Sequence, residues 1–278
     1  MRTLFLLFGL AFGAVARANV IDGLQTRQDV ERFLARKAGR EFKGETIFGS
    51  RPGRDSTDMP GWFYKVDLDG DGLTDLVVNG LKFVVVMDRG DKGFWARTLG
   101  QQDLMDGGLR LLAIDSVGAW KGLEVWNMVH KRRDTLVYHL GSFIEYNAHP
   151  LEHLDLVSLH FSAGGCYGTC PIFELQITGD GHITYHAERF NPIKGEFRGV
   201  IPEADLAWIK QLLTYLPLDR LDSSYAVQWT DDATVWLEMR YNGRVKRISD
   251  YGCQGTLGLS WLYGLLFALR DKVEWENS

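Results

Sequence analysis

The chain lacks the short motifs that mark the commonest catalytic sites. It contains no G-x-S-x-G nucleophile elbow, no H-E-x-x-H zinc helix and no phosphate-binding P-loop. Acidic residues are plentiful, but no pair of them stands out as the two carboxylates of a glycosidase. These absences argue against the serine hydrolases, zinc proteases, nucleotide-binding enzymes and glycosidases that depend on such groups.

Long apolar runs and a positive charge balance are also missing. Beyond the N-terminal segment, the only strongly apolar stretch runs over 257–269, and this is shorter than the roughly 20 residues that a membrane-spanning helix needs. It fits a core helix, so no membrane span is expected. The formal net charge is -5, and an acidic chain is a poor partner for nucleic acid.

The N-terminus has the three parts of a secretory signal peptide. Arg2 supplies a positive start, Leu4 to Val15 form a short apolar run, and Ala16-Arg17-Ala18 fits an A-x-A cleavage site. Cleavage after Ala18 would remove two arginines and no acidic residue, which lowers the formal charge from -5 to -7. The sequence therefore predicts a periplasmic or secreted protein. No cysteine follows the apolar run, which argues against a bacterial lipid anchor.

Strand patterns dominate the rest of the chain, and helical patterns interrupt them at 26–38, 202–216 and 256–275. The first helical segment has Thr26 as a candidate N-cap and Asp29 in the capping-box position. The strands alternate apolar and polar residues between glycine-rich and asparagine-rich turns, such as Asn242-Gly243. This mixture predicts an α+β fold.

Pro150 separates two segments of this mixed kind. We therefore expect two domains after the leader of residues 1–18, namely 19–150 and 151–278. Each is predicted to be a mostly antiparallel sheet with one or two helices.

The stretch YKVDLDGDGLTDLVV places Asp67, Asp69, Asp71 and Asp75 at positions 1, 3, 5 and 9 of one loop, with Gly72 at the sharp turn of position 6. Position 7, Leu73, would offer its backbone carbonyl. Calcium prefers six to eight oxygen ligands, and this spacing arranges oxygens around one point. Without a cation, carboxylates this close repel one another. The sequence predicts a structural Ca²⁺ site, against the alternative of an empty polar turn.

The same stretch resembles the D-x-D-x-D-G-x-x-D loops of the FG-GAP and VCBS-like secreted repeats. The resemblance covers about 30 residues, within 62–95, and its loop is specific. One copy does not make a propeller. Position 12 is Val78 instead of glutamate, and strand patterns flank the loop, so the helix–loop–helix EF-hand is excluded.

A second distinctive stretch, GGCYGTCP, carries Cys166 and Cys170. In an exported protein such a pair is expected to form a disulfide, leaving Cys253 as a buried thiol; a bridge from Cys253 to either of the others is the rival pairing. Thiol-redox or Cu(I) chemistry at Cys166 and Cys170 is an alternative, because thiolates suit Cu(I). The histidines that could complete such a site are His160, His182 and His186.

The cysteine motif, the following strands DGHITY and NGRVKRISDY, and the helical segments between and after them resemble a bacterial family known as domain of unknown function 6438. The resemblance covers about 120 residues of the C-terminal half. It implies an exported protein and carries no catalytic residue with it. Cys253 lies outside the family pattern, which supports pairing the other two cysteines.

Two further clusters are weaker candidates. The acidic and aromatic residues Asp231, Asp232, Asp250 and Tyr251 could line a cleft near the cysteine loop. The indoles of the first domain could form a sugar-binding platform, although core packing is the usual role of tryptophan; these are Trp62, Trp95, Trp120 and Trp126.

These observations favour an exported, non-catalytic binding or interaction module with a structural Ca²⁺ site and an unknown protein or glycan partner. The alternatives are a thiol-redox or copper-binding protein using Cys166 and Cys170, and a carbohydrate-binding protein.

Overall fold

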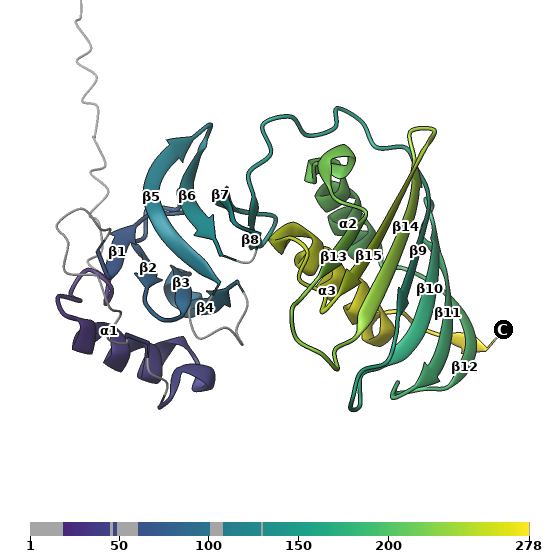
Figure 1. Cartoon of the computed structure of the whole chain (residues 1–278), viewed down its shortest axis with the longest axis horizontal. Helices are drawn as coiled ribbons and strands as arrows, with labels where there is room; N and C mark the ends of the chain where they lie inside the picture. The colour runs from purple at the N-terminus through teal and green to yellow at the C-terminus, as the bar shows by residue number, and fades with distance from the viewer. Residues whose placement is uncertain (1–18, 45–46, 49–60, 101–107, 129, 278) are drawn as a thin grey trace, which may run out of the picture. The chain divides into compact units, whose positions relative to one another are not determined.

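The computed structural model describes residues 19–44, 47–48, 61–100, 108–128 and 130–277 (Figure 1). The predicted signal peptide, residues 1–18, lies outside the described residues. The chain divides into two compact units, residues 1–99 and 100–278. The described part contains no helix long and apolar enough to cross a membrane.

The N-terminal unit packs one helix against a four-stranded antiparallel sheet. Helix α1 (Arg27–Phe33) continues into a π-helical turn (Leu34–Ala38). Its predicted capping box is confirmed: the Asp29 amide donates to Thr26 Oγ1 at 3.1 Å, and the Thr26 amide donates to the Asp29 carboxylate at 2.9 Å.

The sheet of this unit follows the chain in the order β1-β2-β3-β4. Its strands are β1 (Phe63–Val66), β2 (Asp75–Asn79), β3 (Phe83–Asp88) and β4 (Phe94–Leu99). Every residue of β2 and β3 is buried. Apolar side chains of both strands pack with the buried face of α1 in a single core, which fixes the position of the Asp67–Asp75 loop between β1 and β2.

The C-terminal unit begins with a second antiparallel sheet in the order β5-β6-β7-β8. Its strands are β5 (Leu109–Val117), β6 (Trp120–Asn127), β7 (Arg132–His139) and β8 (Ser142–Glu145). Each strand pairs with its chain neighbour, so short turns suffice to connect them.

An eight-stranded sheet follows in the order β13-β15-β14-β9-β10-β11-β12-β16. The strands are β9 (Leu156–Ala163), β10 (Ile172–Thr178), β11 (His182–Arg189), β12 (Gly195–Val200), β13 (Ser224–Ala226), β14 (Thr234–Tyr241), β15 (Arg244–Tyr251) and β16 (Glu276–Asn277). All pairings are antiparallel except that of β13 with β15. The predicted Asn-Gly turn joins β14 to β15 with positive φ at both residues, 47° at Asn242 and 70° at Gly243.

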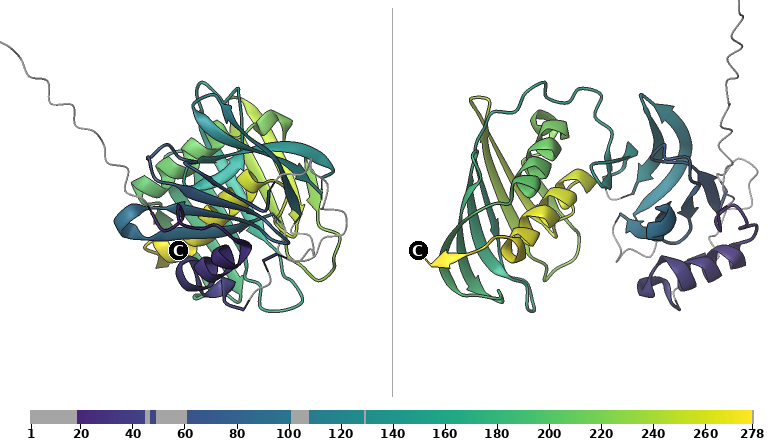
Figure 2. Two further views of the ribbon diagram at one scale, coloured as in Figure 1. Left: turned by 90° about the vertical axis from the view of Figure 1, so that its left-hand side faces the viewer. Right: turned by 180° about the vertical axis from the view of Figure 1, so that it is seen from behind.

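Two helices cover one face of this sheet, α2 (Glu203–Tyr215) and α3 (Leu257–Lys272), as both views in Figures 1 and 2 show. Strand residues alternate between buried and exposed, for example along β10 and β11. The buried set, including Phe161, Leu175 and Tyr185, forms one core with the helices. The opposite face carries mostly polar side chains, with exposed apolar ones such as Trp236 and Val245 elsewhere on the sheet, and no helix of the described part of this unit covers it.

The short sheet β5–β8 is joined to this layer by specific contacts. Glu145 in β8 accepts hydrogen bonds from the first two amides of α3, those of Leu257 at 2.7 Å and Gly258 at 2.9 Å. The Asn147 side-chain amide donates to the Tyr215 carbonyl at 2.6 Å, and the Trp261 indole donates to the Leu140 carbonyl at 2.9 Å. These bonds place β5–β8 in the same compact unit as the eight-stranded sheet.

The structure is mostly β, with three α-helices and three sheets among its described residues. The predicted antiparallel sheets and helices are therefore present. The expected domain division near residue 150 stays a prediction. In the structure, the boundary between the two compact units falls in the sequence between residues 99 and 100. Helix α3 ends at Lys272, before the predicted Trp275, because the chain becomes extended at Val273 and enters β16.

Candidate metal site and disulfide loop

The aspartate loop connects β1 to β2 and brings three carboxylates together. These carboxylates belong to Asp67, Asp69 and Asp71. One side-chain oxygen of each lies within 4.8 Å of one oxygen of the other two. Asp69 and Asp71 are exposed and Asp67 is half-buried. The loop therefore presents an oxygen-rich cluster at the surface of the N-terminal unit.

Backbone amides hold this loop in shape. The two oxygens of Asp67 accept from the Gly70 amide at 2.7 Å and the Gly72 amide at 2.9 Å. Both glycines have left-handed backbones, with φ of 79° and 84°, which other residues adopt only with strain. The Leu73 amide in turn donates to Asp71 at 2.8 Å. This bond holds Leu73, the predicted carbonyl ligand, beside Asp71 of the carboxylate cluster.

Asp75 has a different position from the other three aspartates. It is the first residue of β2, is fully buried, and accepts hydrogen bonds from the Leu68 and Asp88 amides at 2.8 Å each. Burial raises its pKa to about 7, and the nearby charges of Asp69 and Asp71 add to the shift. Asp75 therefore anchors both ends of the loop to the sheet, and it is not one of the three carboxylates that meet within 4.8 Å.

The loop carries concentrated negative charge. The pKa of Asp69 is raised, first by partial burial and then by the charges of Asp71 and Asp67. Mutual repulsion of this kind opposes ionisation of all the carboxylates together. A bound cation would remove that cost.

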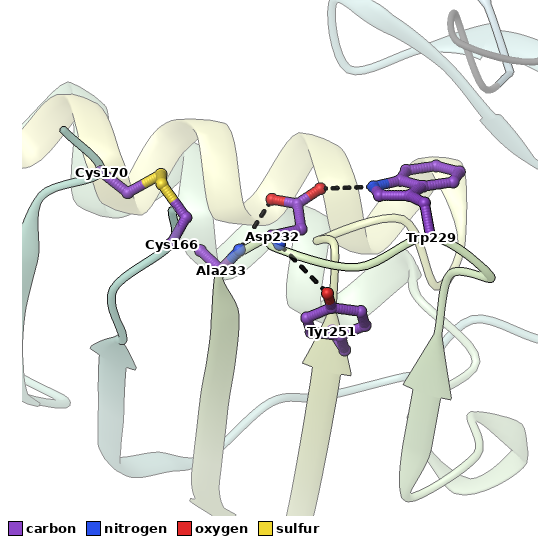
Figure 3. Close-up of a disulfide and its surroundings, with 6 residues drawn as sticks. All are labelled: Cys166, Cys170, Trp229, Asp232, Ala233 and Tyr251. Atoms are coloured by element: carbon purple, nitrogen blue, oxygen red, sulfur yellow. Dashed lines mark hydrogen bonds between the residues drawn. A yellow bond between two sulfur atoms is a disulfide. The ribbon is translucent and has the colours of Figure 1, made fainter. Parts of the chain in front are cut away.

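The disulfide loop lies between β9 and β10. Cys166 and Cys170 form a disulfide with Cα atoms 5.6 Å apart (Figure 3). The side chain between them, Tyr167, is 90% exposed, so the loop extends into solvent. Its base is fixed by two backbone bonds to the segment before β14, from the Gly164 amide to the Thr234 carbonyl and from the Tyr167 amide to the Asp231 carbonyl.

Three of the weaker cleft candidates, Asp231, Asp232 and Tyr251, lie beside this loop. The Asp232 carboxylate accepts from the Trp229 indole at 2.9 Å and from the Ala233 amide at 2.7 Å, and the Asp232 amide donates to the Tyr251 hydroxyl at 3.1 Å (Figure 3). Asp231 contributes its carbonyl to Tyr167. These polar groups are used to hold the turn before β14 against the disulfide loop.

Asp250 lies in the protein interior instead. It is 1% exposed and accepts from the Gln254 and Gly255 amides at 3.1 and 2.8 Å, which shapes the turn between β15 and α3. Burial raises its pKa. In the same turn, Cys253 is a free thiol that is half-buried, where the sequence predicted a buried one, and partial burial raises its pKa to about 12. A thiol with this pKa is not ionised at neutral pH and is a weak nucleophile and metal ligand.

The three histidines considered as copper ligands lie on strands of the large sheet and have carboxylate neighbours. His160 lies 3.4 Å from Glu174, and His182 lies 3.8 Å from Asp180. His186 hydrogen-bonds Glu196, which raises the histidine's pKa. Their polar partners are thus acidic side chains and not the disulfide.

The four tryptophans suggested as a sugar platform belong to two different units. In the N-terminal unit, Arg27 stacks on Trp62 and Arg89 stacks on Trp95. In the C-terminal unit, Trp120 packs edge-on against His139 and Tyr146. Most of these rings therefore already have packing partners.

Two features were not anticipated from the sequence. Glu145 caps a helix that begins 112 residues later in the chain, a contact with no local sequence signal. The second feature is a groove on the face of the eight-stranded sheet opposite the helices, lined by residues of the five strands β14, β9, β10, β11 and β12. Only the strand register reveals that these residues are neighbours.

Residues 157–270 match the model of a protein family described as "Domain of unknown function (DUF6438)". The matched segment contains the disulfide loop, most of the eight-stranded sheet and nearly all of α2 and α3. This match confirms the resemblance expected from the cysteine motif. No curated protein matches the chain.

Proposed function

We propose that this chain is an exported protein that acts by binding and not by catalysis, and that a calcium ion at the aspartate loop stabilises its N-terminal unit. The close approach of the Asp67, Asp69 and Asp71 oxygens, within 4.8 Å, is the observation that supports the calcium site.

The grouping fits calcium in both distance and chemistry. Two oxygens bound to one Ca²⁺ at about 2.3–2.6 Å lie at most about 5 Å apart, and the ion prefers carboxylate and carbonyl oxygens. Asp67, Asp69 and Asp71 would supply the carboxylates, and Leu73 would add its carbonyl. Asp75, which ties the loop to β2 and β3, would complete the site directly or through water.

A binding role is supported by the way the polar groups near the disulfide are used. Asp232 is hydrogen-bonded to Trp229 and Ala233, and Tyr251 accepts from the Asp232 backbone. Asp250 is buried and bonded to backbone amides. These groups stabilise turns, which leaves them poorly suited to bind and release a substrate proton.

The calcium site is tested by thermal unfolding of the mature chain in calcium and in EGTA. A ligand present at 100 times its Kd stabilises a folded protein by about 2.7 kcal/mol, so calcium should raise the Tm of the wild-type chain. Asp69→Asn keeps the oxygen that accepts from the Asp71 amide at 3.3 Å but removes the charge. We expect this variant to fold and to lose the calcium response.

Asp91→Asn is the matched control, because Asp91 is also an exposed aspartate in a turn of the same unit. It should respond to calcium as the wild type does. Equal Tm values of the wild type in calcium and in EGTA would refute the site.

Thiol chemistry at Cys166 and Cys170 is a second candidate, favoured by the exposure of the loop between them. Mild reductant followed by mass spectrometry distinguishes the two roles. A bridge that resists reduction supports the structural role, whereas a pair that is readily reduced and then binds Cu(I) supports the thiol function.

A further inference from the structure

The bare face of the eight-stranded sheet carries two adjacent rows of polar side chains. In the first row, strand pairing sets Arg240, Ser158 and Thr178 side by side across β14, β9 and β10. His182 on β11 follows, because the Thr178 hydroxyl lies 3.2 Å from its backbone carbonyl. These residues alternate with buried ones along each strand, so their side chains share the face opposite the helices.

The second row is displaced from the first by two residues along each strand, and it includes one strand more, β12. It runs through Glu238, His160, Gln176, Thr184 and Arg198, from β14 to β12. Four strand spacings of roughly 4.8 Å separate β14, which carries Arg240, from β12, which carries Arg198, so the backbones of these two strands lie about 19 Å apart across the sheet.

These two rows line a groove with a volume of about 430 Å³, which is within the usual range of ligand sites. A second groove of about 540 Å³ adjoins it at the edge of the sheet and shares His182, Arg198 and Gly199 with it. Arg198 therefore stands where the two hollows meet.

Arg198 is exposed, and it has no ion pair or side-chain hydrogen bond with the part of the chain that the structure describes. Glu276 lies opposite it in the β12–β16 pairing without forming an ion pair. An arginine presents five N–H donors in a planar fork that fits a carboxylate. The guanidinium of Arg198 is thus free to bind an anion from solution.

Three carboxylates beside the first groove, those of Glu238, Glu174 and Asp180, already have partners. Glu238 bonds both Arg240 at 3.2 Å and Arg247 at 2.7 Å. Glu174 lies 3.4 Å from His160, and Asp180 is hydrogen-bonded by Thr178 and lies 3.8 Å from His182. Of the arginines and glutamates that line the first groove, Arg198 is thus the one without a charged partner in the described chain, while Glu274 and Glu276 line the adjoining groove beside it.

We infer that this groove binds an acidic oligosaccharide, with Arg198 holding a carboxylate of the sugar and the neutral side chains binding its hydroxyls. The inference rests on the proposed binding role and names the ligand class. Ser158, Thr184 and Gln176 can each both donate and accept hydrogen bonds, as sugar hydroxyls do. The groove extends across five strands, from Arg240 on β14 to Arg198 on β12, and this extent suits an extended chain of sugars.

A protein partner fits this groove less well. Protein interfaces rely on buried aromatic and apolar anchors, and the exposed apolar side chains of this sheet, such as Trp236 and Val245, lie outside the groove lining. The lining combines the buried residues Leu159, Ile177 and Ile183 with exposed polar side chains, among them the imidazole rings of His160 and His182, and none of its residues is an exposed large apolar side chain.

The test is calorimetric titration of the mature chain with trigalacturonate in calcium-free buffer, because uronates chelate calcium. Maltotriose, of equal length and neutral, and a triglutamate peptide are titrated alongside. Arg198→Gln removes the charge and should weaken trigalacturonate binding about tenfold or more, as expected for the loss of a charge-assisted contact. Thr184→Val should weaken it several-fold. Both residues are exposed, so the Tm should not change.

Arg189→Gln is the matched control, since Arg189 lies on β11 at the other end of the strand and outside the groove; its binding should equal that of the wild type. The inference is overturned if trigalacturonate does not bind, if Arg198→Gln binds it as the wild type does, or if maltotriose or triglutamate binds equally well. The calcium-dependent Tm is measured separately, so failure of this groove and failure of the proposed calcium site give different results.

Discussion

Replacement of Glu145 tests how the small sheet β5–β8 is held to helix α3, which packs on the eight-stranded sheet. Its two carboxylate oxygens accept from the Leu257 and Gly258 amides at 2.7 and 2.9 Å. These are two of the four amides that a helix leaves without an internal partner at its start. Thr256 satisfies a third, that of Leu259, at 3.0 Å. Glu145 also places negative charge at the positive end of the α3 dipole.

The expected cost follows from these two bonds. An unsatisfied buried amide costs about 1–3 kcal/mol. Glu145 is partly exposed, so water would recover part of this loss, and we expect Glu145→Ala to lower the free energy of unfolding by about 2–4 kcal/mol. Glu145→Gln keeps one acceptor oxygen and should cost about half as much.

Urea unfolding followed by tryptophan fluorescence measures this loss, with Glu188→Ala as control. Glu188 is an exposed glutamate on β11 whose nearest cation, His186, is 3.7 Å away, and surface changes of this kind usually stay within about 0.5 kcal/mol. A Glu145→Ala cost below about 1 kcal/mol, or equal to that of the control, would refute the capping role.

Three further outcomes are expected. Burial lowers the pKa of His139 in the folded chain, so the unfolded chain takes up this proton at a higher pH than the folded chain does. The free energy of unfolding should therefore decrease below about pH 6.5. If the free energy of unfolding of a His139→Gln variant, measured by urea titration, falls as steeply with pH, this reasoning is contradicted. Reduction of the Cys166–Cys170 bridge should cost about 2 kcal/mol or less, because the closed loop is short, and a much larger loss in urea unfolding would be inconsistent with a local role. Cys253 is half-buried and has a pKa of about 12, so it should react with a thiol reagent much more slowly in the native chain than after unfolding, and equally rapid labelling of both states would contradict the raised pKa.

Local features of the fold were predictable because their signals lie within a few residues. The capping box needs only Thr26 and Asp29, and the β14–β15 turn needs only Asn242 and Gly243. The spacing of the aspartates likewise implied that Asp67, Asp69 and Asp71 would converge. In each case backbone geometry over one turn determines the arrangement.

Contacts between distant segments were not predictable in this way. Glu145 and Leu257 meet across 112 residues, and their pairing depends on how two sheets pack. The burial of Asp75 was not predictable from the loop spacing alone, and its role as a metal ligand stays a prediction. Asp75 belongs to the loop, but its burial at the start of β2 directs its oxygens to the Leu68 and Asp88 amides. The groove residues are neighbours only because the strand order places β9 between β14 and β10.

The calcium content of the purified mature chain is the most direct test of the aspartate site. After dialysis against calcium and removal of free ions, elemental analysis should find one calcium per chain in the wild type and in Asp91→Asn, and none in Asp69→Asn. Absence of bound calcium from the wild-type chain, or equal calcium in Asp69→Asn, would contradict the site.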